Sequence, residues 1–94
     1  MNYNVSQILN FENCNAGIPF YLIRDASIEI ICDNWQSNID LAESFIAGTV
    51  DIAAESASIN ESLSEAGCET RVDEYVVKKA LAYWVEVETL SGNL

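Results

Sequence analysis

The sequence predicts a single α+β domain, residues 1–94, in which an N-terminal β hairpin or small antiparallel sheet packs against two amphipathic helices. Three features predict this fold. Two short apolar runs rich in β-forming residues come first, a long segment with apolar residues at helical spacing follows, and a second helical pattern lies near the C-terminus. Half of the residues are hydrophobic, so the chain has the material for a core.

The hairpin is expected within residues 17–33. Its strands would be residues 20–23 and 28–32, joined by the polar step between them. Residues 3–12 allow either a third strand or a short helix with one mostly apolar side. Both alternatives stay open, because short apolar runs do not distinguish a strand from a buried helix. The apolar side of such a helix would contain Val5, Ile8, Leu9 and Glu12.

A long helix is expected from about residue 38 to residue 66. At about 100° per residue, its small and apolar side chains share an arc of about 120°. Ser37 or Asn38 can cap its start, and Gly67 follows its end, where glycine is favoured. Gly48 interrupts the pattern at a cost of about 1 kcal/mol relative to alanine, so it either divides the helix or marks a close packing contact. The arc contains Ala42, Phe45, Ile52, Ser56, Ile59, Leu63 and Ala66.

The opposite side of this helix is acidic. All six acids between residues 39 and 67 fall on it, and the chain has no basic residue between Arg24 and Arg71. Like charges three or four residues apart repel each other, at a total cost on the order of 1 kcal/mol, which is unusual if solubility is the only purpose. We take the six carboxylates as candidate partner-binding residues, with a merely solvated face as the alternative. They are Asp40, Glu43, Asp51, Glu55, Glu61 and Glu65.

A second amphipathic helix is expected over residues 73–90. Lys78 can form an ion pair with Glu74, and Lys79 lies on the same side of the helix as Glu86. Two of the four basic side chains would then be neutralised within this helix. Its apolar side contains Val76, Val77, Ala80, Leu81, Tyr83, Trp84 and Val87.

Nothing in the sequence indicates catalysis. Histidine, the commonest general base and imidazole metal ligand, does not occur. The four glycines form no phosphate-binding motif, and the acids match no calcium-loop spacing. Cys14, Cys32 and Cys68 are an odd number, at spacings that fit neither a disulfide framework nor a metal site. We therefore expect no enzyme activity, no cofactor and no bound metal.

The sequence also indicates a cytoplasmic protein. Its first residues, "MNYNVSQILNFENC", have no basic region followed by an apolar run, as an export signal would have. No stretch approaches 18 consecutive apolar residues, about the minimum for a membrane-spanning helix. Three cysteines without the spacing of a disulfide framework suit a reducing compartment.

The net charge of −11, from 15 acids against four bases, argues against direct binding to nucleic acid or to an anionic membrane. In size, acidity and lack of catalytic residues, the chain resembles the small acidic inhibitors that phages and mobile elements use against CRISPR effectors or restriction enzymes, several of which imitate nucleic acid. It also resembles bacteriocin immunity proteins, which neutralise basic nuclease toxins. Both resemblances imply a protein of the bacterial cytoplasm that occludes a basic nucleic-acid-binding surface of its target.

Affinity for such a target requires desolvated contacts as well as charge. Trp35, in an expected loop, and Tyr75, which points away from the apolar side of its helix, are the candidate anchors. A structural role is the alternative from a different class of function. The apolar positions from Ile52 to Ala66 follow steps of four and three, as in a coiled coil, and this seam could form a homodimer whose acids keep it soluble.

Overall fold

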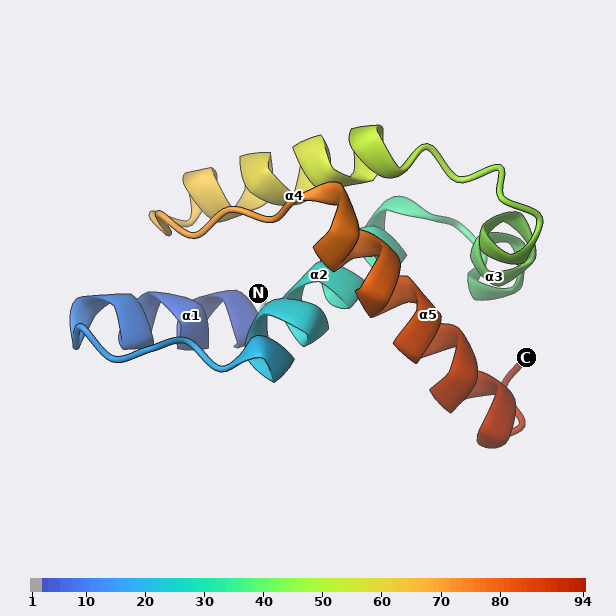
Figure 1. The fold of residues 1–94 in the computed structure, drawn as a ribbon, viewed down its shortest axis with the longest axis horizontal. Coiled ribbons are helices and arrows are strands. Elements are labelled where there is room, and N and C mark those ends of the chain that lie inside the picture. Colours follow the sequence, from blue (N-terminus) through green and yellow to red (C-terminus); the bar gives the residue numbers. More distant parts are fainter. Residues whose placement is uncertain (1–2) are drawn as a thin grey trace.

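Five helices make up the fold, and residues 3–94, which the computed structural model describes, contain no strand (Figure 1). The predicted α+β fold with an N-terminal hairpin is therefore wrong, and the described chain is all-helical. The prediction of two helices is also wrong, because the described chain has five. The elements are α1 (Tyr3–Asn13), α2 (Phe20–Asn34), α3 (Asn38–Ile46), α4 (Ile52–Glu65) and α5 (Glu74–Leu90).

Both predicted strands lie within α2. Leu22, Ala26 and Ile30, spaced by four residues, are all buried on one side of this helix, so the apolar runs and the polar step between them share one helical face. Ser27 lies in that step and donates its hydroxyl to the carbonyl oxygen of Ile23, 2.7 Å away, as serine does inside a helix. Pro19 immediately precedes the helix, where proline is well tolerated. The β-branched residues of α2 favoured a strand, but tertiary packing decides the structure.

Residues 3–12, which the sequence allowed to be either a strand or a helix, lie in α1. Val5 and Ile8 of α1 are buried against the core, and α1 packs on α2. The chain then reverses direction between the two helices (Figure 1). The first two residues of the segment inspected for an export signal lie outside the described residues.

Gly48 divides the predicted long helix into α3 and α4. Its φ of 75° is in the left-handed region, which glycine adopts without a steric penalty. Its backbone N–H donates to the carbonyl of Phe45, and the next N–H, that of Thr49, donates to the carbonyl of Ser44. These two bonds form a Schellman motif, which ends α3. The predicted cap at the start of α3 is confirmed, since the Ser37 hydroxyl accepts from the N–H of Asp40 at 3.3 Å.

The hydrophobic core receives side chains from all five helices, with α2 at its centre (Figure 1). α2 contacts α1, α4 and α5, and the last two also contact each other. α3 lies at the end of the molecule away from α1 and contributes Leu41 and Ala42 (Figure 1). The C-terminal helix is confirmed within one residue of its predicted start, with Asp73 as its cap. Its buried side chains are Val77, Ala80, Leu81 and Trp84.

Candidate functional site

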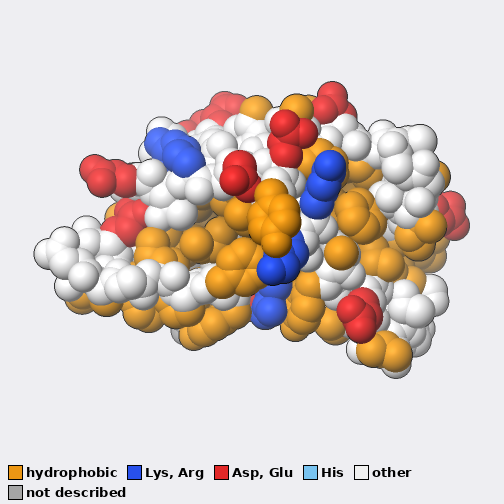
Figure 2. All heavy atoms as spheres, in the orientation of Figure 1, with side chains coloured by type: hydrophobic (Ala, Val, Ile, Leu, Met, Phe, Trp, Pro, Cys, Tyr) orange, Lys and Arg blue, Asp and Glu red, His pale blue; other side chains and the backbone are white. Residues whose placement is uncertain are grey.

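Five of the six predicted carboxylates form an exposed acidic surface over α3 and α4, which we call the acidic edge. In Figure 2, acidic side chains lie along the upper margin above α4 and at the right margin beside α3. Asp51 also caps α4, because its carboxylate accepts from the N–H of Ala54 at 3.1 Å. The acidic edge consists of Asp40, Glu43, Asp51, Glu61 and Glu65.

Among the described residues, no cation neutralises the acidic edge. Within residues 3–94 the one ion pair joins neighbours on α2, the Arg24 Nε and an Asp25 carboxylate oxygen, 2.9 Å apart. The five carboxylates of the acidic edge are therefore exposed without a paired cation from the described chain, where a protein partner could meet them.

Glu55, the sixth predicted carboxylate, belongs to the packing between helices. Its Oε1 accepts a hydrogen bond from the indole Nε1 of Trp35 at 3.1 Å. Its other oxygen, Oε2, is buried and makes no hydrogen bond with the described residues. Trp35 is itself half-buried, packed against the core at the end of α2. The structure thus brings two predicted partner-binding residues together, in a contact within the chain.

Tyr75, the other predicted anchor, is 66% exposed at the start of α5. The Lys79 ammonium lies 5.5 Å from the centre of its ring and 5.6 Å from the ring of Phe20. Nearby on the same helices, the Arg24 guanidinium stacks 3.8 Å from the ring of Tyr83. These distances are those of cation–π contacts. Figure 2 shows the result, with basic side chains among hydrophobic ones in the middle of this face.

The predicted ion pairs within α5 are absent. Neither Lys78 nor Lys79 lies within 4.0 Å of a carboxylate oxygen in the part of the chain that is described. The prediction that Glu74 and Glu86 neutralise these lysines is therefore wrong. Lys79 instead uses aromatic rings, and Lys78 has no charged or hydrogen-bonding partner among residues 3–94.

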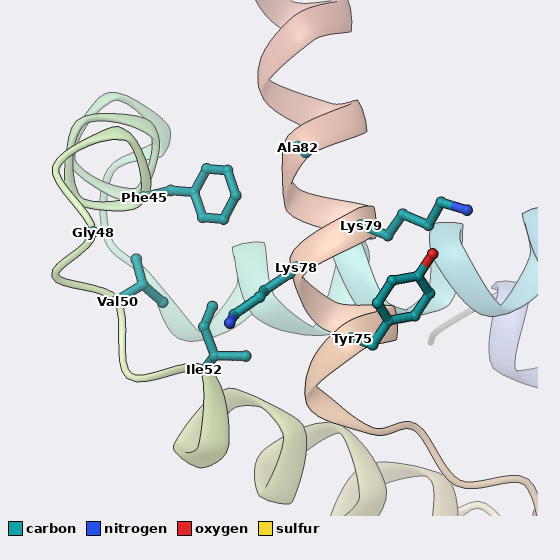
Figure 3. Close-up of a pocket in the computed structure, with 8 residues that line it drawn as sticks. All are labelled: Phe45, Gly48, Val50, Ile52, Tyr75, Lys78, Lys79 and Ala82. Atoms are coloured by element: carbon teal, nitrogen blue, oxygen red, sulfur yellow. The ribbon is translucent and has the colours of Figure 1, made fainter.

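A hollow of about 590 Å³ lies between α5 and the turn that joins α3 to α4. Figure 3 shows Phe45 projecting from α3 toward α5, and Lys78 extending from α5 toward Val50 and Ile52. Ala82 lies one turn further along α5. Helical periodicity identified Phe45 and Ile52 as apolar positions. No pattern along the chain shows that Phe45 of α3 lines the same hollow as residues of α5, so the sequence analysis missed this hollow.

The outward face of α3 carries a second feature that the sequence analysis missed. Ile39 and Ile46 are 55% and 73% exposed, and with Glu43 they occupy positions i, i+4 and i+7 of one helical face. Their spacing in the sequence could have revealed this face, because it places both isoleucines on the side of α3 opposite the buried Leu41. The acidic edge therefore has apolar side chains next to its carboxylates.

A network of hydrogen bonds holds the loop before α5 in place. The Glu12 carboxylate of α1 accepts from the N–H groups of Glu69 and Thr70, at 2.9 and 2.8 Å, and from the Thr70 hydroxyl. These bonds, the Thr70 hydroxyl foremost, together with the charge of Arg71, lower the pKa of Glu12 below its ordinary value, although desolvation opposes the shift. From the other side, Asn60 bonds both the N–H and the carbonyl of Val72.

The three cysteines are free and lie in different environments. Cys14 is exposed, Cys32 is half-buried and Cys68 is buried in the core. Burial raises the pKa of the Cys32 and Cys68 thiols, which makes both less reactive. Among the described residues, no three histidine, cysteine or acidic side chains are grouped as metal ligands would be.

Comparisons with protein-family models, with curated proteins and with solved structures gave no match. Within residues 3–94, each helix is too short or too polar to cross a bilayer.

Proposed function

We propose that this protein binds a basic nucleic-acid-binding surface of another protein and occludes it with the acidic edge. The observation that supports this function best is the absence of any ion pair on α3 or α4 in the described chain, which leaves five exposed carboxylates uncompensated. Such a surface attracts a positive groove over a distance of about 8 Å at physiological salt and increases the rate of encounter. Association is therefore fast and sensitive to salt.

The two-helix arrangement changes what this surface can imitate. A single straight row of six carboxylates would have resembled a strand of phosphates, but the Gly48 turn redirects the chain and Glu55 faces the indole of Trp35. Occlusion by charge and shape, with no close copy of a nucleic-acid strand, is the form of the proposal that these contacts support. Its targets are a CRISPR effector, a restriction enzyme or a nuclease in the cytoplasm of a bacterial host cell.

Affinity in this proposal comes from the apolar side chains of α3. Charges at the rim of an interface mainly change the association rate, whereas buried apolar anchors slow dissociation. Ile39 and Ile46 flank Glu43 on one exposed face, so a partner that meets the carboxylate also covers both isoleucines. Tyr75, which is also exposed, is an additional anchor for a larger partner.

An immunity protein that neutralises a basic nuclease toxin would use the same surface and differs only in its target. Assembly through the seam of α4 is less well supported. Ser56, Ile59 and Leu63 of that seam are buried in the core of their own chain, so a second copy would have to bind elsewhere.

The test is capture from a host lysate on the tagged protein, with bound proteins identified after washes at low and then high salt. The proposal predicts a nucleic-acid-binding protein that elutes with salt and is displaced by added nucleic acid. A partner that remains bound when nucleic acid occupies its groove would contradict occlusion.

Two double variants separate the acidic edge from net charge. Glu61→Lys with Glu65→Lys changes the edge, and Glu74→Lys with Glu86→Lys changes exposed residues of α5. Each pair raises the net charge from −11 to −7, because each reversal adds two charges. Only the first pair should reduce capture. Glu55 is unsuitable for this purpose, since reversing it would break its bond to Trp35.

A further inference from the structure

The hollow between α5 and the turn after α3 has the features of a small-molecule site, and the acidic edge does not use it. Its volume of about 590 Å³ lies within the usual range for such sites, about 300 to 1,000 Å³. Its walls are the ring of Phe45 and the aliphatic side chains of Val50 and Ile52. Apolar walls with a few well-placed polar groups are typical of ligand pockets.

Among the described residues, the cationic group that lines this pocket without a partner is the ammonium of Lys78. Figure 3 shows its side chain running from α5 along the hollow toward Val50 and Ile52. It makes no hydrogen bond, ion pair or ring contact with any described residue. Lys79 also lies at the pocket, but its ammonium is engaged by the rings of Phe20 and Tyr75.

We propose that this pocket binds a small amphiphilic anion, whose apolar part packs against Phe45, Val50 and Ile52 while its anionic group pairs with the ammonium of Lys78. An apolar ligand alone would cover the apolar walls but gain nothing from the ammonium of Lys78, which is exposed and has no partner among the described residues. A hydrophilic anion would leave the apolar walls exposed. A ligand with both parts satisfies the whole site.

The net charge of −11 does not prevent this selectivity. Repulsion from exposed carboxylates that do not line the pocket is screened within about 8 Å at physiological salt, and Asp51, between Val50 and Ile52, directs its carboxylate to the N–H of Ala54. The charged residues that line the pocket are Lys78 and Lys79, the two lysines of the chain, and no carboxylate lines it. The local potential therefore favours an anion where the apolar walls are, and this charge complementarity favours a ligand over a second copy of the same acidic chain.

Titration with octanoate, followed by the amide NMR shifts of the whole chain, tests the proposal, with 1-octanol as the uncharged control. Octanoate should shift the amides around Gly48, Val50 and Ala82 in a saturable way. Octanol should bind about tenfold more weakly, because it lacks the charge that pairs with the ammonium.

Two lysine variants form a matched pair. Lys78→Met keeps the aliphatic stem and removes the charge, and it should weaken octanoate binding about tenfold while leaving octanol binding unchanged. Lys79→Met removes the same charge from a neighbouring position and should change octanoate affinity less than twofold. Ala82→Phe, at an exposed position that lines the hollow, should reduce the binding of both ligands.

Three results would overturn the proposal. The first is the absence of saturable shifts near the pocket with octanoate. The second is equal affinity for octanoate and octanol with no effect of Lys78→Met. The third is a concentration-dependent dimer by analytical ultracentrifugation that Ala82→Phe abolishes, because a second copy would then be the occupant.

Discussion

The indole Nε1 of Trp35 donates to Oε1 of Glu55 at 3.1 Å, and this bond joins the end of α2 to α4. It connects two residues that sequence reasoning had assigned to a partner. The half-buried position of both side chains gives the bond a measurable role in stability.

Glu55→Ala should lower the free energy of unfolding by about 1 to 2 kcal/mol, because it leaves the indole N–H without its acceptor. Glu55→Gln should cost less than Glu55→Ala, since the amide oxygen can accept the same bond and the loss of the buried charge offsets the unpaired amide N–H at the position of Oε2. Urea unfolding would measure the free energy of unfolding of both variants and of Trp35→Phe, each against the wild type. Equal destabilisation by alanine and glutamine would show that the charge itself is required.

Gly48→Ala should destabilise the protein by about 1 kcal/mol or more, because alanine is strained at the φ of 75°. The helix propensity of alanine alone predicts the opposite sign. Gly17→Ala is the control, as Gly17 has no positive φ and no atoms within 4 Å of an added Cβ. It should be neutral or slightly stabilising. Thermal unfolding distinguishes the two, and a stabilising Gly48→Ala would indicate a continuous helix.

Glu12→Gln should cost about 1 to 2 kcal/mol at neutral pH, because the carboxylate accepts three hydrogen bonds from Glu69 and Thr70. The folded-state pKa of Glu12 is lowered, so its contribution is present above the unfolded value, about 4.3, and is lost as the pH falls through the folded value. The difference in free energy of unfolding between the wild type and Glu12→Gln should therefore become smaller at acidic pH, as urea unfolding at several pH values would show. Glu69→Gln, at an exposed side chain, serves as the control. A difference in free energy of unfolding that does not change with pH would contradict the stabilising role of the ionised Glu12 carboxylate.

One thiol per chain should react rapidly with a thiol reagent at mildly alkaline pH. Cys14 is exposed, while burial and a raised pKa protect Cys32 and Cys68. Cys14→Ser should remove the fast phase without changing the two slow ones. Two fast thiols in the wild type would mean that α2 or the loop before α5 opens more readily than this packing implies.

Periodicity predicted α5 and the helical character of α3 and α4, because their apolar residues recur at helical spacing over many turns. It failed for α2, where Ile28, Ile30 and Ile31 favour a strand in isolation and only contacts with α1, α4 and α5 decide. The role of Gly48 could not be decided either, since a glycine can interrupt or continue a helix. The sequence placed all six acids on one side of a single helix, but which of them faces solvent depends on how α2 meets α4, as the contact between Trp35 and Glu55 shows.

The most direct test of the central claim is the association rate of the captured partner with wild-type protein and with Glu61→Lys/Glu65→Lys, measured at low and high salt. The account predicts a rate about tenfold lower for this variant at low salt, a smaller difference at high salt, and no change for Glu74→Lys/Glu86→Lys. Equal rates for wild type and both variants at low salt would contradict the claim that the acidic edge brings the protein to its target.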